Sequence, residues 1–124
     1  MHKKRILVVD DSEIVLVMAR EALESGGFEV VTALSAREVD AFIASQRIPD
    51  LIIMDVMLPG LEGDKKARML KDNKLTRSIP ILLLSSKPDV ELQRLTIESG
   101  ADGFIRKPFG HQMLVAKVRE VVKA

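Results

Sequence analysis

The sequence contains no cysteine, so disulfides, thiol catalysis and thiolate metal ligands are excluded. Its charge is almost balanced, with 19 Lys and Arg against 18 Asp and Glu, so overall electrostatics predict neither a nucleic-acid nor a membrane partner. No apolar run approaches the roughly 20 residues that a membrane span needs, and the run behind the basic N-terminus is too short for a signal peptide. We therefore expect a cytoplasmic protein, and the missing cysteines suit that reducing compartment.

What the sequence does contain is a pattern of five short apolar runs, each followed by a segment whose apolar residues recur at helical spacing. The chain has 124 residues, and we expect one domain over 1–124 with a substantial core. The expected strands are 6–9, 28–33, 51–55, 81–84 and 103–106. Such alternation predicts an α/β fold, in which a five-stranded parallel sheet is doubly wound by helices.

The segments between the strands carry helix start signals. Ser12, Ser35 and Asp64 can each cap the helix that follows, and further helices are expected from Asp89 and from about His111 to the terminus. The apolar positions expected to face the core are Val15, Met18, Ala19 and Ala22; Val39, Phe42 and Ile43; Ala67, Met69, Leu70 and Leu75; Leu92 and Leu95; and Leu114, Val115, Val118, Val121 and Val122.

Polar residues follow four of the expected strands. Asp10 and Asp11 follow the first, Asp55 ends the third, Ser85 follows the fourth and Lys107 follows the fifth. The carboxyl ends of parallel strands lie at one edge of a sheet, so we expect these side chains to converge there. Each residue alone is better explained as a cap, a turn residue or a solvated side chain, but all five explanations would have to hold at one edge.

Three neighbouring carboxylates need compensation, because each pair at about 4 Å repels by about 4 kcal/mol when the effective dielectric constant is near 20. Lys107 offsets one charge and a divalent cation offsets two more. With oxygen ligands alone, Mg²⁺ and Ca²⁺ are the candidates, and Mg²⁺ is favoured because a phosphoryl group could complete its shell. A carboxylate beside Mg²⁺, a hydroxyl and a lysine is suited to accept a phosphoryl group, with Asp55 attacking in line.

These motifs occur in a characteristic order and spacing. They are the apolar run into Asp10-Asp11, the Asp55 strand with Met57-Leu58-Pro59-Gly60 and Gly63 behind it, Ser85-Ser86, and Lys107-Pro108-Phe109. From Ile6 to Val122 the sequence resembles the receiver domains of two-component response regulators, the family of the bacterial chemotaxis regulator. The resemblance implies a flavodoxin-like (βα)5 fold with strand order 2-1-3-4-5.

The resemblance also implies a role for each site residue. Asp55 would be the phosphoacceptor for a sensor histidine kinase or a phosphotransfer protein. Asp10, Asp11, Asp55 and the backbone carbonyl of Met57 would hold Mg²⁺. Such a protein is a signalling phosphoacceptor that assists its own phosphorylation and dephosphorylation, and is not an enzyme with a separate substrate.

Two residues would act as the switch. Ser85 would hydrogen-bond the phosphoryl group, and Phe104 stands where the family often has a tyrosine that swings inward. We predict that the Phe104 ring favours the buried position, since it has no hydroxyl to draw it toward water; the alternative is an ordinary core residue. Lys107 would pair with a phosphoryl oxygen, placed by a cis Lys107–Pro108 bond. The output would pass through the face of the fourth helix, fifth strand and fifth helix, to an unknown effector or to a second copy in a homodimer.

Other features leave alternatives open. We hypothesise that Met57 and Lys87 slow hydrolysis of the phosphoaspartate by crowding the attacking water, although Lys87 could simply be solvated. A basic series could be a solvated face or a docking surface for an acidic partner. Its members are Lys65, Lys66, Arg68, Lys71, Lys74 and Arg77.

Three rival functions are weaker. An aspartyl-phosphate phosphatase would place a second acid where Met57 stands. A flavodoxin-like nucleotide binder would not set Asp10 and Asp11 against a phosphate without metal. A degenerate receiver that only binds partners would not need every acidic-site residue. Whether the chain acts alone or belongs to a longer protein is left open.

Overall fold

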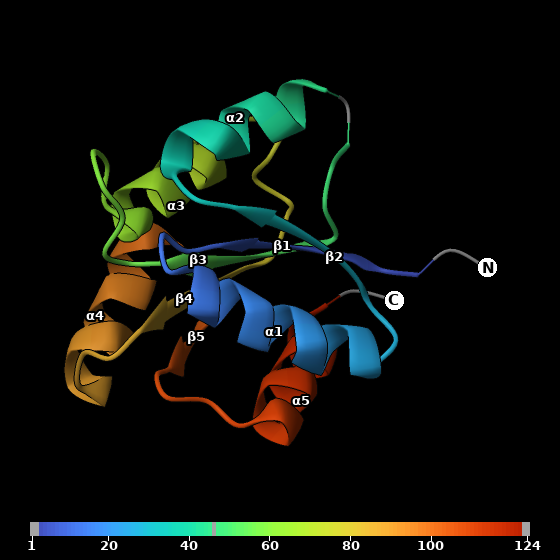
Figure 1. Cartoon of the computed structure of the whole chain (residues 1–124). Coiled ribbons are helices and arrows are strands. Elements are labelled where there is room, and N and C mark those ends of the chain that lie inside the picture. The colour runs from blue at the N-terminus through green and yellow to red at the C-terminus, as the bar shows by residue number, and fades with distance from the viewer. Residues whose placement is uncertain (1–2, 46, 123–124) are drawn as a thin grey trace.

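The computed structural model describes residues 3–45 and 47–122, and these form a five-stranded parallel sheet with helices on both faces (Figure 1). The strands are β1 (Arg5–Val9), β2 (Glu29–Ala33), β3 (Leu51–Asp55), β4 (Ile81–Ser85) and β5 (Gly103–Arg106). They lie in the order β2-β1-β3-β4-β5, and every neighbouring pair is parallel. The predicted fold class and strand order are confirmed.

The helices divide between the two faces of the sheet. They are α1 (Glu13–Ser25), α2 (Ala36–Ala44), α3 (Gly63–Asp72), α4 (Asp89–Ser99) and α5 (His111–Val121). In Figure 1, α1 and α5 lie on one side of the sheet, and α2 and α3 lie on the other. Along β1, Ile6 and Val8 pack into the first core while Leu7 and Val9 pack into the second. Among the described helices, none combines the length and the hydrophobicity that crossing a bilayer would require.

Two of the three expected helix caps are confirmed. The Ser12 hydroxyl accepts a hydrogen bond from the Val15 N–H, and the Ser35 hydroxyl accepts one in the same position of α2. The prediction for Asp64 is wrong, because α3 begins at Gly63 and Asp64 lies inside its first turn. The Gly63 N–H is already bonded to a carbonyl of the preceding loop, so the helix can start without a side-chain cap.

Several predicted core positions are wrong. On α1 the buried residues are Leu16, Ala19, Ala22 and Leu23, while Met18 is 38% exposed, because this helix packs on α5 as well as on the sheet. Met69 and Leu75 are exposed, the first on α3, where it lines a hollow shared with Asp40 of α2, and the second beyond the end of α3. The last helix ends at Val121, and the predicted continuation to the terminus reaches residues 123–124, which lie outside the described residues.

The basic series is not one solvated face. Lys66 is 3% exposed and its ammonium pairs with the Asp40 carboxylate on α2. The ammonium of Lys71 lies 2.9 Å from the Asp102 carboxylate and donates to the carbonyl of Ile79. These two lysines therefore hold helices in place, and the exposed members are Lys65, Arg68, Lys74 and Arg77.

A cluster of polar contacts ties elements together where β4 begins. The Asp102 carboxylate accepts from the backbone N–H of Ile81 at 2.8 Å as well as from Lys71. A second contact joins residues three or four positions earlier in α3 and α4: the Arg68 guanidinium donates to the carbonyl of Glu98, near the end of α4, at 2.7 Å. The ends of α3 and α4 are thereby fixed to the amino end of the sheet.

Candidate functional site

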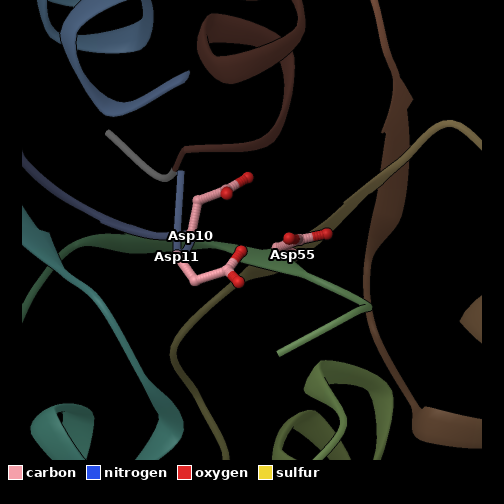
Figure 2. Close-up of side chains that lie close together, drawn as sticks. All are labelled: Asp10, Asp11 and Asp55. Atoms are coloured by element: carbon pink, nitrogen blue, oxygen red, sulfur yellow. The ribbon is translucent and has the colours of Figure 1, made fainter. Parts of the chain in front are cut away.

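Two neighbouring strands bring three carboxylates together. Val9 pairs with Met54 in the register of β1 and β3, so Asp10 and Asp55 follow side by side at the carboxyl ends of these strands. One oxygen from each of Asp10, Asp11 and Asp55 lies within 4.8 Å of the other two, and Figure 2 shows the three side chains gathered at this edge. The expected convergence of the acids is thus present in the fold.

Asp10 is the most deeply placed of the three. Its side chain is completely buried, and its Oδ1 accepts a hydrogen bond from the backbone N–H of Ser12 at 2.9 Å. The Lys107 ammonium lies 2.9 Å from Oδ2 as an ion pair but outside hydrogen-bonding geometry, so among the described residues this oxygen has no donor. A buried carboxylate oxygen without a donor carries a large desolvation penalty.

Asp55 is 4% exposed and is held at both oxygens. Its Oδ1 accepts from the backbone N–H of Met57 at 3.2 Å, and its Oδ2 lies 3.6 Å from the Lys107 ammonium. Burial, and next the negative charge of Asp10, raise the pKa of Asp55 to about 6, with a smaller contribution from Asp11. Lys107 and the Met57 N–H oppose this rise.

Lys107 stands between the two buried acids because the chain around it is fixed to β4. Its backbone N–H donates to the carbonyl of Ser85 at 2.8 Å, and its bond to Pro108 is cis, as the resemblance led us to expect. The side chain is 24% exposed and reaches both Asp10 and Asp55. One ammonium therefore faces three carboxylates, and the site keeps an excess of negative charge.

Ser85 lies at the same edge. Leu84 pairs with Asp55 across β3 and β4, so Ser85 stands one residue beyond the acid on the adjacent strand. It is 2% exposed, and its Oγ accepts from the backbone N–H of Lys87 at 3.0 Å, which uses an oxygen lone pair and not the hydroxyl proton. The Lys87 ammonium pairs with the Glu91 carboxylate at 3.3 Å.

The two remaining predicted residues differ in exposure. The Met57 side chain is 65% exposed. Phe104 is half-buried, packs against the second core and forms part of a cavity of about 570 Å³ between α4, β5 and α5, together with Ile97 and Met113. The Phe104 ring is therefore not fully turned to solvent, and its preference for the buried position stays a prediction.

The donor set fits a hard divalent cation. The ligand atoms within reach of one another are carboxylate oxygens, which suit Mg²⁺. The donor-less Oδ2 of Asp10 and the unbalanced charge are both relieved by a cation at this point. Asp10, Asp11 and Asp55 could hold such an ion. Asp55 could also attack an electrophile, with the Lys107 ammonium nearby to neutralise charge.

Sequence reasoning missed how closely one backbone segment approaches Asp55. The sequence marks Gly63 only as part of a motif, yet its Cα lies against the Asp55 carbonyl group. A signal was available, because glycine is a poor helix former and stands here at the first position of α3. The sequence could not say which group approaches it.

Comparison with known proteins agrees with what the geometry of the acidic site indicates. The family model described as the response regulator receiver domain matches residues 6–119 of this chain. The phosphate regulon transcriptional regulatory protein PhoB of Pseudomonas aeruginosa is 40% identical over 123 residues, which are 99% of this chain and 53% of that protein. The chain thus spans about half the length of this relative.

Solved structures share the fold at full length. A response regulator described as putative, from Chloroflexus aurantiacus, superposes with a TM-score of 0.90 at 34% identity, covering 96% of this chain and 97% of the other. The chemotaxis response regulator CheY4 of Vibrio cholerae superposes with a TM-score of 0.89 at 30% identity, covering 98% of this chain and 100% of the other.

Proposed function

Since the chain belongs to the family of response regulator receiver domains, we propose that it accepts a phosphoryl group on Asp55, with Mg²⁺ as cofactor. The phosphoacceptor role is general to this family, and receiver domains are signalling modules and not enzymes in the usual sense. The donor would be the phosphohistidine of a sensor histidine kinase or of a phosphotransfer protein. The observation that carries the proposal is the meeting of three acids and one lysine at the end of β3.

The transfer itself asks little covalent chemistry of the protein. An oxygen of Asp55 forms a new bond to phosphorus while the bond from phosphorus to the donor imidazole breaks, and the imidazole leaves. Mg²⁺ held by Asp10, Asp11 and Asp55, with the Met57 carbonyl as a further proposed ligand, would neutralise the incoming negative charge. Asp55 is already oriented for this step, since its Oδ1 is held by the N–H of Met57.

Two further residues would stabilise the transferred group. The Lys107 ammonium, 3.6 Å from Asp55 Oδ2, can pair with a phosphoryl oxygen without moving far. The Ser85 hydroxyl retains its proton for donation, and turning toward the phosphoryl group would draw the loop after β4 inward. By stabilising the phosphoryl group in this way, Lys107 and Ser85 would assist both the phosphorylation of Asp55 and the later hydrolysis of the phosphoaspartate.

The inward motion of the loop after β4 would change a surface of the protein away from the acidic site. Phe104 on β5 pairs with Leu83, two residues before Ser85 on β4, and its half-buried ring would fill space vacated when the loop after β4 moves inward. The face formed by α4, β5 and α5 would then change its population of states and bind an output domain, an effector or a second copy. We propose that this occurs in the cytoplasm, without direct contact with membrane or nucleic acid.

The test is phosphoryl uptake from a small donor. Incubation with acetyl phosphate and Mg²⁺ should give a phosphorylated protein, resolved by intact-mass spectrometry or by phosphate-affinity electrophoresis. The Asp55→Asn variant and an EDTA-treated sample should take up none. A wild-type protein that takes up no phosphoryl group from acetyl phosphate or from phosphoimidazole, with Mg²⁺ present, would overturn the proposal.

A further inference from the structure

We propose that Gly63 is a positioning residue for the acidic site: the absence of a side chain there lets α3 rest on the backbone of Asp55 and fix the loop that carries Met57. The inference rests on the proposed function, because it assigns to Gly63 the placement of groups that would hold Mg²⁺ and orient Asp55. No atom of Gly63 needs to touch the phosphoryl group or the cation for this role.

The approach of Gly63 to β3 leaves no room for a methyl group. A Cβ at this position would lie 1.8 Å from the carbonyl oxygen of Asp55, 2.7 Å from its carbonyl carbon and 2.9 Å from Cγ of Met54. Contacts under 3.0 Å are essentially never made by real Cβ atoms, and two of these three are with backbone that cannot swing aside. Any larger residue therefore has to separate α3 from β3 by about 1 Å or more.

The same glycine closes a ring around the loop between Asp55 and α3. The Gly63 N–H donates to the carbonyl of Val56 at 2.8 Å, and the Val56 N–H donates to the carbonyl of Leu84 on β4 at 3.0 Å. The loop turns at Gly60, whose φ of +83° is unfavourable for residues with a side chain. Both ends of the loop are therefore fixed to the sheet, and its path is set by how closely α3 can approach.

The ring includes the groups next to the phosphoacceptor. Met57 lies inside it and donates its N–H to Oδ1 of Asp55 at 3.2 Å. A displaced α3 pulls on Gly63, then on the Val56 carbonyl, and so on the Met57 backbone. Loss of such an outer support weakens metal sites by about 10- to 100-fold, and an error of about 1 Å in the position of reacting groups slows catalysis by about 100-fold.

The chain offers two matched controls for the substitution Gly63→Ala. Gly26 follows the last residue of α1, away from the acids. Gly26→Ala also creates a clash, at 2.9 Å, but with the side chain of Val115 on α5. Gly110→Ala meets nothing within 4 Å and needs no unusual backbone. Gly26→Ala therefore reports the effect of lost stability alone, and Gly110→Ala reports the effect of replacing a glycine just before a helix.

The first experiment measures Mg²⁺ affinity by calorimetry and the initial rate of phosphorylation by acetyl phosphate. Both are calculated from the concentration of folded protein. Gly63→Ala should lose about 10- to 100-fold in both, while Gly26→Ala and Gly110→Ala stay within about twofold of the wild type. Equal behaviour of Gly63→Ala and Gly26→Ala would overturn the inference while leaving the proposed function intact. A wild type without Mg²⁺ binding or phosphoryl uptake would overturn both.

A second measurement needs no variant and decides the matter if Gly63→Ala does not fold. Coupling is reciprocal, so if Gly63 positions the site, a bound cation must stabilise the contact of Gly63 with β3. At free Mg²⁺ about tenfold above its dissociation constant, exchange of the Gly63 amide hydrogen should slow by about tenfold. The Gly26 amide, bonded to the Ala22 carbonyl, should change less. Equal slowing of the two amides, or none, would overturn the inference.

Discussion

Replacing the proposed phosphoacceptor with its amide should stabilise the protein when no metal is bound. Burial and the neighbouring acids raise the pKa of Asp55 from 3.8 to about 6, so the folded protein holds this proton more tightly than the unfolded chain does. Each unit of such a difference corresponds to 1.36 kcal/mol, and the charged carboxylate therefore lowers the free energy of unfolding by up to about 3 kcal/mol. Asp55→Asn removes that charge and keeps an oxygen for the Met57 N–H.

The sign of the pH dependence follows from the direction of this shift. Below pH 3.8 the carboxyl is protonated in both the folded and the unfolded state, and Asp55→Asn should change the free energy of unfolding little. Between pH 3.8 and about 6 the unfolded chain loses the proton first, so the wild type becomes progressively less stable than the variant. Above about pH 6 the full difference of about 1 to 3 kcal/mol should persist.

Urea unfolding in EDTA at several pH values from 4 to 8 measures this difference. With a slope of about 1–3 kcal/mol per molar urea, the variant's midpoint should rise by roughly 1 M at neutral pH. Mg²⁺ should narrow the gap, since a ligand tenfold above its dissociation constant stabilises the folded wild type by about 1.4 kcal/mol. Glu21→Gln, an exposed acid on α1, is the control. A variant no more stable than the wild type at pH 7.5, or an advantage that does not change with pH, would refute the reasoning.

Further predictions concern the surroundings of the site. Lys107→Met removes the counter-charge that Asp10 and Asp55 share. In EDTA it should raise the pKa of Asp55, measured by carboxyl NMR, and lower the free energy of unfolding by roughly 2 kcal/mol. An unchanged pKa of Asp55 would contradict the ion pairs. Asp40→Asn should destabilise by about 1 to 3 kcal/mol in urea unfolding, because it leaves a buried ammonium without its carboxylate, and an unchanged midpoint would contradict this. Met57→Ala should shorten the lifetime of the phosphorylated protein several-fold, and more than Lys87→Ala does, because the Lys87 ammonium is already paired; lifetimes unchanged in both variants would remove the crowding hypothesis.

The position of the acidic site was predictable because it follows from topology. Parallel strands end at one edge of a sheet, so residues placed after the first, third, fourth and fifth apolar runs must meet there. The same logic could give no distances. That Asp10 keeps an oxygen without a donor, and that Lys107 reaches two acids, depends on side-chain packing between strands that are far apart in sequence.

The errors concern helices more than strands. Lys66 and Lys71 belong to a run of charge that composition alone would place in solvent, yet both are held by acids on other elements. Met18 fits a helical stripe, but the buried side of α1 is set by where α5 lies. A strand buried on both faces is recognisable from its own residues, whereas the buried side of a helix depends on its neighbours.

The polar contacts where β4 begins have a mechanical consequence for α4. This helix is anchored near its last turn, where the Glu98 carbonyl accepts from Arg68 and where the following segment is held through Asp102. Its first turn has no side-chain cap, and Asp89 at its start forms an exposed ion pair of 3.6 Å with Arg106 on β5. Because these polar contacts hold the last turn, inward movement of the loop that Ser85 would pull should displace the first turn of α4 more than its last.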